Sequence, residues 1–170
     1  LRNMRKGITV EQMYRFVRDA RRAGILVHGC FMAGNPGETH ETLARTLELA
    51  KRLNPDTAQF FPLMVYPGTE AYDWAERNGY LTTRDYREWL TPEGLHNCVL
   101  STPALSSQDL VAWCDRARRE FYLRPRYVWS KLRQIATRPA EFKRVSMAAR
   151  TFLPFLFGDR TARGRRRKRP

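Results

Sequence analysis

The sequence predicts an α/β fold, because short apolar segments alternate with amphipathic helical patterns over the first eighty residues. Two segments, 25–32 and 58–65, are almost wholly apolar, which is typical of strands covered on both faces of a parallel sheet. A helical pattern separates them, and strands joined through a helix run parallel with a right-handed crossover. Because two strands alone cannot bury both faces, we expect further strands before Leu1 or from another chain.

The first helix is expected to begin after Thr9. Gln12 stands at the capping-box spacing from Thr9, and Ile8 can form a hydrophobic staple with Met13. Gly24 is a natural C-terminal stop. Apolar residues at helical spacing predict one buried stripe: Met13, Phe16, Val17 and Ala20.

The following elements are read in the same way. A second helix with Leu43, Leu47 and Ala50 on one face is expected to end before Asn54. The second strand contains Pro62, which cannot donate a ladder hydrogen bond and therefore favours a sheet edge. A third helix is predicted over 70–77.

Beyond Gly79 the pattern becomes irregular as far as residue 105, and helices are predicted over 106–121, 124–137 and 140–157. The helix over 106–121 carries one apolar face: Leu110, Trp113, Cys114, Ala117 and Phe121. We expect three parts: the α/β part at 1–80, a helical extension at 81–157 and a basic, disordered tail at 158–170.

Composition and charge exclude several classes of protein. No apolar run approaches the ~20 residues that a membrane-spanning helix needs, and the first residues are charged, unlike a signal peptide. Three widely separated cysteines argue against a disulfide scaffold or zinc site, and indicate reduced thiols in the cytoplasm. The net charge is +14, and segment 124–170 carries fifteen basic residues against two acidic ones.

The turn at 31–39 is the densest chemical signal. It joins the end of a strand to the start of a helix, where ligands bind in α/β folds. Gly34 and Gly37 permit positive φ and a close approach of a ligand to the backbone. The helix start would offer unpaired N–H groups to that ligand. An ordinary glycine-rich connection is the alternative interpretation.

Three segments resemble radical SAM domains, in the order and at the separations usual for that family. Residues 31–39 are similar to the G-x-P-G-E-T segment after the fifth barrel strand, and residues 5–9 to the R-K-G-x-T stretch before that strand. Residues 62–69 resemble the sixth-strand segment that ends in P-G-T. The tract at 121–125 resembles the region that follows the barrel in cobalamin-binding members, which include enzymes of hopanoid and bacteriochlorophyll biosynthesis.

The resemblance, which covers about 1–127, implies the C-terminal part of a partial (β/α)6 TIM-like barrel, open at its sixth strand, followed by the helical extension. It implies cleavage of S-adenosylmethionine (SAM) at a [4Fe–4S] cluster to a 5′-deoxyadenosyl radical. It also suggests cobalamin and the methylation or rearrangement of a lipid or isoprenoid-type substrate. The residues that it places at the SAM site are Phe31, Met32, Gly34, Pro36, Gly37, Glu38, Phe61 and Leu63.

One feature of the family is missing from the sequence. The chain has no C-x-x-x-C-x-x-C motif, and Cys30, Cys98 and Cys114 cannot imitate it. We therefore expect no metal ligands in this chain, cluster ligands upstream of Leu1, and no radical chemistry from the chain alone. A catalytically inert basic module that binds RNA or a membrane surface is the alternative.

Other side chains have structural interpretations beside functional ones. His28 and Cys30 are expected in the core, and Trp113 and Phe121 as packing residues. Tyr66 is a candidate pocket wall. Glu38 would either contact the SAM amino group or favour the helix dipole.

The basic C-terminal segment has three interpretations. It is a solvated extension, an amphipathic anchor that places a cytoplasmic protein at the inner face of an anionic membrane, or a nucleic-acid contact. Nucleic acid is the least favoured partner, because no RNA-binding module or aromatic platform is apparent.

Overall fold

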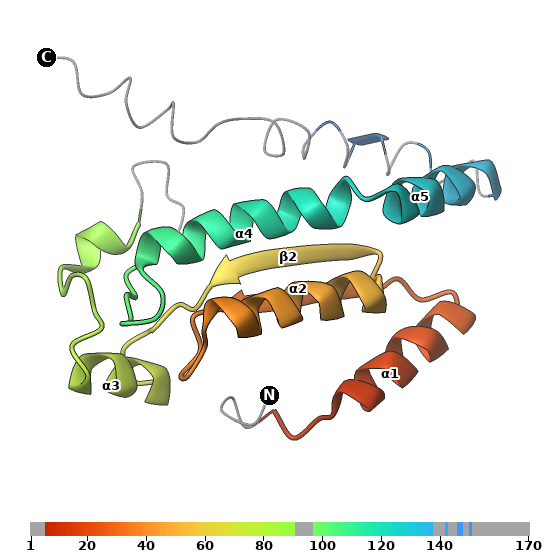
Figure 1. Cartoon of the computed structure of the whole chain (residues 1–170). Helices are drawn as coiled ribbons and strands as arrows, with labels where there is room; N and C mark the ends of the chain where they lie inside the picture. Colours follow the sequence, from red (N-terminus) through yellow and green to blue (C-terminus); the bar gives the residue numbers. More distant parts are fainter. Residues whose placement is uncertain (1–5, 91–96, 138–141, 143–145, 148–149, 151–170) are drawn as a thin grey trace, which may run out of the picture. The chain divides into compact units, whose positions relative to one another are not determined.

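The computed structural model describes residues 6–90, 97–137, 142, 146–147 and 150. The described part contains five α-helices, one 3-10 helix and a two-stranded parallel sheet (Figure 1). The chain divides into two compact units, Leu1–Phe121 and Tyr122–Pro170. The α/β class with parallel strands is therefore confirmed. The described residues do not form a barrel, which stays a prediction.

Helix α1, Val10–Arg22, begins and ends where the sequence indicates. The Gln12 N–H donates to Thr9 Oγ1 at 3.2 Å, and the Thr9 N–H donates to Gln12 Oε1 at 2.7 Å, which completes the capping box. Val17 and Ala20 are buried against the rest of the unit. The prediction for Phe16 is wrong, because its side chain is 64% exposed. Helix α1 contacts α2 over a narrower stripe than the pattern suggests. Because Phe16 is rotated by about 100° around the helix axis from Val17, its side chain lies outside this stripe.

Strands β1, His28–Ala33, and β2, Thr57–Pro62, pair in parallel from His28↔Thr57 to Ala33↔Pro62. Strand β1 begins three residues later than predicted. The Ile25 N–H donates to Ala20 O at 2.9 Å and so finishes α1, and the Val27 N–H donates to the Asp56 carboxylate at 3.0 Å. These bonds hold 25–27 in the connection, and its apolar residues Ile25 and Leu26 are exposed.

Helices α2, His40–Leu53, and α4, Ser107–Tyr122, lie on one face of this sheet. Phe60 of β2 is 1% exposed and its ring lies 5.2 Å from Phe31, 5.9 Å from Trp113 and 5.9 Å from Phe121. A salt bridge of 2.6 Å between Lys51 Nζ and Glu120 Oε2 joins α2 to α4. The buried faces predicted for both helices are confirmed.

Segment 81–105, for which the sequence predicts no regular element, contains some local order. After α3, Glu70–Arg77, an isolated antiparallel bridge joins Leu81 to Leu100. The 3-10 helix η1, Tyr86–Trp89, follows the N-cap Asp85.

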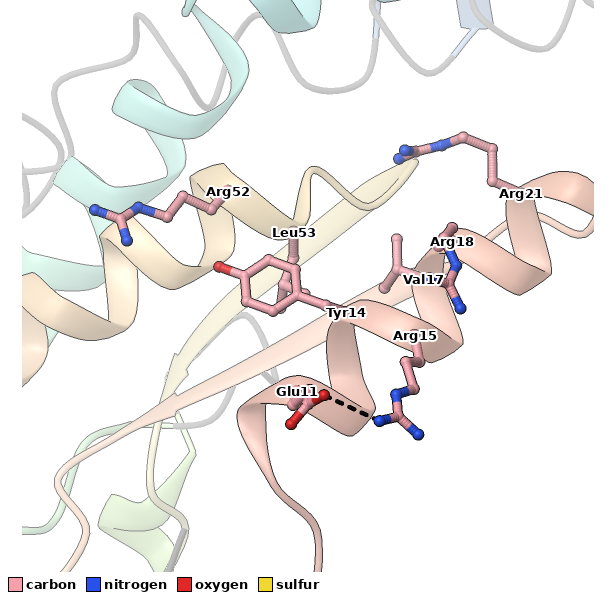
Figure 2. Close-up of a pocket in the computed structure, with 8 residues that line it drawn as sticks. All are labelled: Glu11, Tyr14, Arg15, Val17, Arg18, Arg21, Arg52 and Leu53. Carbon is pink, nitrogen blue, oxygen red and sulfur yellow. Dashed lines mark hydrogen bonds and ion pairs between the residues drawn. The ribbon is translucent and has the colours of Figure 1, made fainter.

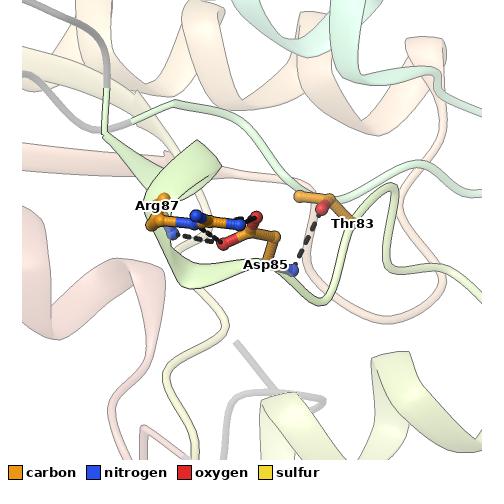
Figure 3. A network of polar contacts seen from close by, with 3 residues as sticks. All are labelled: Thr83, Asp85 and Arg87. Atoms are coloured by element: carbon orange, nitrogen blue, oxygen red, sulfur yellow. Dashed lines mark hydrogen bonds and ion pairs between the residues drawn. The ribbon is translucent and has the colours of Figure 1, made fainter.

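The cap of η1 is held by a small polar network (Figure 3). Arg87 donates to the Asp85 carboxylate from its backbone N–H at 3.0 Å, from Nε at 3.0 Å and from Nη2 at 2.7 Å. The Asp85 N–H donates to Thr83 Oγ1 at 3.1 Å. The Arg87 guanidinium holds the pKa of Asp85 below its usual value. Trp89 is buried at the end of this helix.

The second unit contributes helix α5, Pro125–Thr137, to the described residues, and its side chains are not buried. Lys131 Nζ lies 5.3 Å from the Tyr127 ring centroid, a cation–π distance. The helix predicted over 140–157 lies mostly outside the described residues, and the tail at 158–170 lies wholly outside them. None of the helices in the described part is long and apolar enough to cross a membrane.

Candidate functional site

The second face of the sheet carries side chains that alternate with the packed ones. His28 and Cys30 of β1 and Gln59 of β2 are exposed there, and Thr57 is half-buried. His28 Nδ1 lies 2.7 Å from Thr57 Oγ1, which places these register partners on the same face. No helix of the described part covers this row, so this open face is available to a ligand or to further polypeptide.

The open face changes character along the strands. Its polar residues lie where the strands begin, and Met32 and Phe61 lie as register partners near the carboxyl ends. Both of these side chains are half-buried. Parallel α/β folds bind ligands at the carboxyl ends of their strands, so Met32 and Phe61 offer an apolar surface at the expected place.

The turn after β1 depends on Gly34. Its φ is +100°, and a Cβ there would lie 3.1 Å from both Leu100 Cδ2 and Leu110 Cδ1. A side chain at this position would therefore meet the packed layer under the turn. Gly37, with φ +76°, supplies the second left-handed residue of the turn.

Glu38 closes the turn with its carboxylate. Its Oε2 accepts hydrogen bonds from the Gly34 N–H and, at 3.0 Å, from the Asn35 N–H. Asn35 Nδ2 donates to Met32 O at 3.1 Å, which ties the turn to the end of β1. The second oxygen of Glu38 has no hydrogen bond to any described residue, so it stays available to a cationic donor.

Helix α2 is capped by its own side chains. The Thr42 N–H donates to Thr39 Oγ1 at 3.4 Å, and the Thr39 N–H donates to Thr42 Oγ1 at 2.9 Å. With the two bonds to Glu38, four N–H groups of this region are paired inside the protein. The expectation that the turn and helix start offer N–H groups to a ligand is wrong for these four.

The structure separates the eight predicted SAM-site residues into three groups. Met32 and Phe61 lie on the open face, and Gly34, Pro36, Gly37 and Glu38 form the adjoining turn. Phe31 and Leu63 are different. The Phe31 ring stacks on Phe60 on the packed face, and Leu63 is buried, its N–H donating to Ala33 O at 2.6 Å. The Phe31 side chain therefore lies away from the open face, and any contact of Phe31 with a ligand there would involve its backbone.

His28 and Cys30 correct the sequence interpretation, which placed them in the core. Both are exposed on the open face, and Thr57 and Gln59 beside them were not singled out from the sequence. The alternation of β1 would have shown a two-faced strand once its start was placed at His28. Tyr66, the candidate pocket wall, is 47% exposed beyond the end of β2.

The comparisons with known proteins bear on this site. No family model matches the chain. An uncharacterized methyltransferase of Pyrococcus horikoshii is 34% identical over 71% of the chain, and a probable threonylcarbamoyladenosine tRNA methylthiotransferase of the same organism is 34% identical over 48%. A tRNA-2-methylthio-N(6)-dimethylallyladenosine synthase of Paracoccus denitrificans is 37% identical over 46%.

The chain is a distant, partial homologue of radical SAM methylthiotransferases. The stretches matched in the three relatives amount to 26%, 20% and 18% of their own lengths, so the chain spans about a quarter of these curated relatives or less. The resemblance to radical SAM proteins is confirmed at this level, whereas the cobalamin-binding group is not shown.

The homologues imply SAM and an iron–sulfur cluster for the family. The turn and the Met32–Phe61 surface fit SAM, because they combine an apolar wall with a carboxylate oxygen that no described residue occupies. The cysteines do not fit a cluster. Cys30 is exposed on the open face, whereas Cys98 and Cys114 are buried, and the described residues contain no group of three potential metal ligands.

Proposed function

We propose that this chain forms the end of the barrel of a radical SAM enzyme and one wall of its SAM site. The observation that carries the proposal is the position of Met32 and Phe61, side by side on the open face and next to the turn at 34–38. Distant homology to methylthiotransferases and to a methyltransferase supports it. When bound, SAM and a cluster held by other residues supply the 5′-deoxyadenosyl radical that abstracts a substrate hydrogen.

The residues of this chain bind and orient SAM in the proposal. Met32 and Phe61 exclude water from the adenine and contact it with apolar surface. The second carboxylate oxygen of Glu38 accepts a hydrogen bond from the SAM ammonium, while the first continues to hold the turn. The backbone of Pro36 and Gly37 borders the same site.

We further propose RNA as the substrate class. By their names, two of the relatives above act on tRNA, and the chain has a net charge of +14, which suits a polyanion. The cobalamin dependence and the lipid or isoprenoid-type substrate inferred from the sequence rest on the resemblance alone. The membrane-surface partner and the extension at 81–157 likewise stay proposals.

The intact polypeptide from its source cells tests the proposal. An antibody to this chain should detect a product of several hundred residues, and the purified protein should reconstitute a [4Fe–4S] cluster anaerobically and cleave SAM to 5′-deoxyadenosine. A product near 20 kDa that binds neither cluster nor SAM would instead support the inert basic module.

The variant Glu38→Gln tests the part of the SAM site that this chain is proposed to provide. Glutamine keeps a carbonyl oxygen for the turn but removes the negative charge, so SAM should bind roughly tenfold more weakly, the equivalent of ~1.4 kcal/mol. Gln59→Ala is the matched control, because Gln59 lies on the same open face but farther from the turn. Equal SAM affinities of Glu38→Gln and the control would remove Glu38 from the site.

A further inference from the structure

A basic groove lies between α1 and α2, on elements other than the sheet face that carries the proposed SAM site (Figure 2). Its volume is about 390 Å³, within the range of pockets that hold small organic ligands. Three arginines of α1 and one of α2 line it, together with an aromatic side chain: Arg15, Arg18, Arg21, Arg52 and Tyr14.

The four guanidinium groups differ in how they are neutralised. Arg15 pairs with Glu11 at 3.0 Å, and Arg18 pairs with Asp19 at 3.0 Å. Arg21 donates to the uncharged carbonyl of Asn54 at 3.0 Å, and Arg52 has no partner in the described part of the chain. Two positive charges, one on each wall of the groove, are therefore not balanced by a described carboxylate.

The helix dipole explains part of this arrangement. Arg21 and Arg52 stand in the last turns of α1 and α2, where basic residues are favourable. The dipole does not require them to line one cavity from two different helices. Figure 2 shows Tyr14 extending from α1 toward Leu53 and the stem of Arg52 on α2, so an aromatic surface lines the same groove as the two charges.

These features match the chemistry of a nucleic-acid backbone. Guanidinium groups bind phosphate through paired N–H donors, and an aromatic ring in the same groove can stack on an unpaired base. An anionic lipid headgroup would satisfy the charges but would leave Tyr14 without a stacking partner.

We propose that the groove between α1 and α2 binds the sugar–phosphate backbone of the RNA substrate. Arg21 and Arg52 contact phosphate oxygens, and Tyr14 stacks on a base or packs on a ribose. The groove is a positioning surface and takes no part in the reaction. The identity of the RNA rests on the proposed function, whereas the polyanion contact rests on the groove alone.

Fluorescence anisotropy of the intact protein with a labelled tRNA transcript tests the proposal, and this binding needs neither cluster nor SAM. The variant Arg21→Gln/Arg52→Gln should bind at least tenfold more weakly at 100 mM salt. Each lost phosphate contact reduces the magnitude of the slope of log K against log salt concentration by about 0.7–0.9. The loss of two contacts should therefore make the slope less steep by about 1.5. Tyr14→Leu should weaken binding without changing the slope.

Arg77→Gln is the matched control. Arg77 of α3 is exposed and, like Arg21, donates to a backbone carbonyl, that of Asp73 at 3.0 Å. This variant should bind RNA within twofold of the wild type. Because Arg52 has no described partner to lose, Arg52→Gln alone decides the question if the double variant does not fold.

Two outcomes would overturn the proposal. One is the same affinity and salt slope for Arg52→Gln as for Arg77→Gln. The other is a double variant, Arg21→Gln/Arg52→Gln, that binds the tRNA transcript as tightly as the wild type but binds equimolar phosphatidylserine–phosphatidylcholine vesicles more weakly. That result would assign the groove to a membrane surface. Because cluster formation and SAM cleavage are measured separately, a failure here is distinct from a failure of the proposed function.

Discussion

Two glycines with similar backbone angles differ in the space around them. Gly34 and Gly68 have φ of +100° and +80°, but only at Gly34 would a Cβ meet other atoms within 4 Å. Gly68→Ala should cost the left-handed strain alone, about 1–2 kcal/mol of unfolding free energy. Gly34→Ala should add the clash with Leu100 and Leu110, for a total of about 2–5 kcal/mol. Urea denaturation of both variants measures the difference, and equal losses would mean that the two leucines move aside freely.

Burial of a thiol predicts a pH dependence of stability. Cys114 is 1% exposed, and burial raises its pKa from the ordinary 9.0 to about 12. Below pH 9 the thiol is protonated in both states and contributes no slope. Between pH 9 and 12 the unfolded chain releases the proton more readily, so stability should fall with rising pH, by up to about 1.4 kcal/mol per unit.

The variant Cys114→Ala isolates this effect. Other groups also titrate at high pH, so the measurement is the loss of unfolding free energy between pH 8 and 10.5 in the wild type minus that in the variant. We expect a smaller loss in the variant. Identical losses would show that the folded protein admits the thiolate without cost.

Sequence patterns predicted the packed residues better than the exposed ones. Leu110, Trp113 and Phe121 follow a helical period that one neighbouring surface can satisfy, and all three are buried. His28 and Cys30 lie in an apolar run, and such a run indicates covering layers on both faces without saying which segments provide them. The described residues provide one layer, so the other face stays open.

At the scale of the element, adjacent residues of β2 have opposite roles. Phe60 packs between Phe31, Trp113 and Phe121, whereas Phe61 lies half-buried on the open face. Phe60→Ala should therefore reduce the unfolding free energy by about 3–5 kcal/mol. Phe61→Ala should cost about 1 kcal/mol or less, because less of its apolar surface is removed from water.

The effects of the two variants on SAM binding should be the reverse of their effects on stability. Phe61→Ala should weaken SAM binding by the intact protein while the protein stays folded, whereas the folded fraction of Phe60→Ala should bind SAM normally. Denaturation and SAM titration of the two variants separate the roles. A large loss of stability in Phe61→Ala would mean that its face is packed against other polypeptide in the intact protein.

The helix caps are the structural features that the sequence predicted best. Thr9, Gln12 and Asn54 act within a few residues of their own helix, so the sequence contains the whole interaction. The bridge between Leu81 and Leu100 and the burial of Trp89 depend on residues far apart in the chain. No local pattern specifies such contacts, which is why the segment at 81–105 was predicted to be irregular.

At the scale of the whole molecule, the far edge of β1 is the main unsatisfied feature. Ala33 O accepts from the Leu63 N–H and Val27 O from the Thr57 N–H, so alternate residues of β1 bond to β2. The N–H groups of His28, Cys30 and Met32 therefore point toward the opposite edge. No strand among the described residues pairs with that edge, and an edge of this kind readily accepts another strand.

Hydrogen exchange of the intact protein tests whether a strand lies there. If β1 is the fifth strand of a barrel, the amides of Cys30 and Met32 should be as protected as that of Phe31, which bonds to β2 and serves as the internal reference. If the edge is open, these two amides should exchange much faster than Phe31, near the rate of the exposed turn at Gly68. Fast exchange would contradict the barrel, because a parallel strand paired at this edge must protect alternate amides of β1. The binding of RNA by the groove between α1 and α2 would be unaffected by that result, since the groove needs only the two helices.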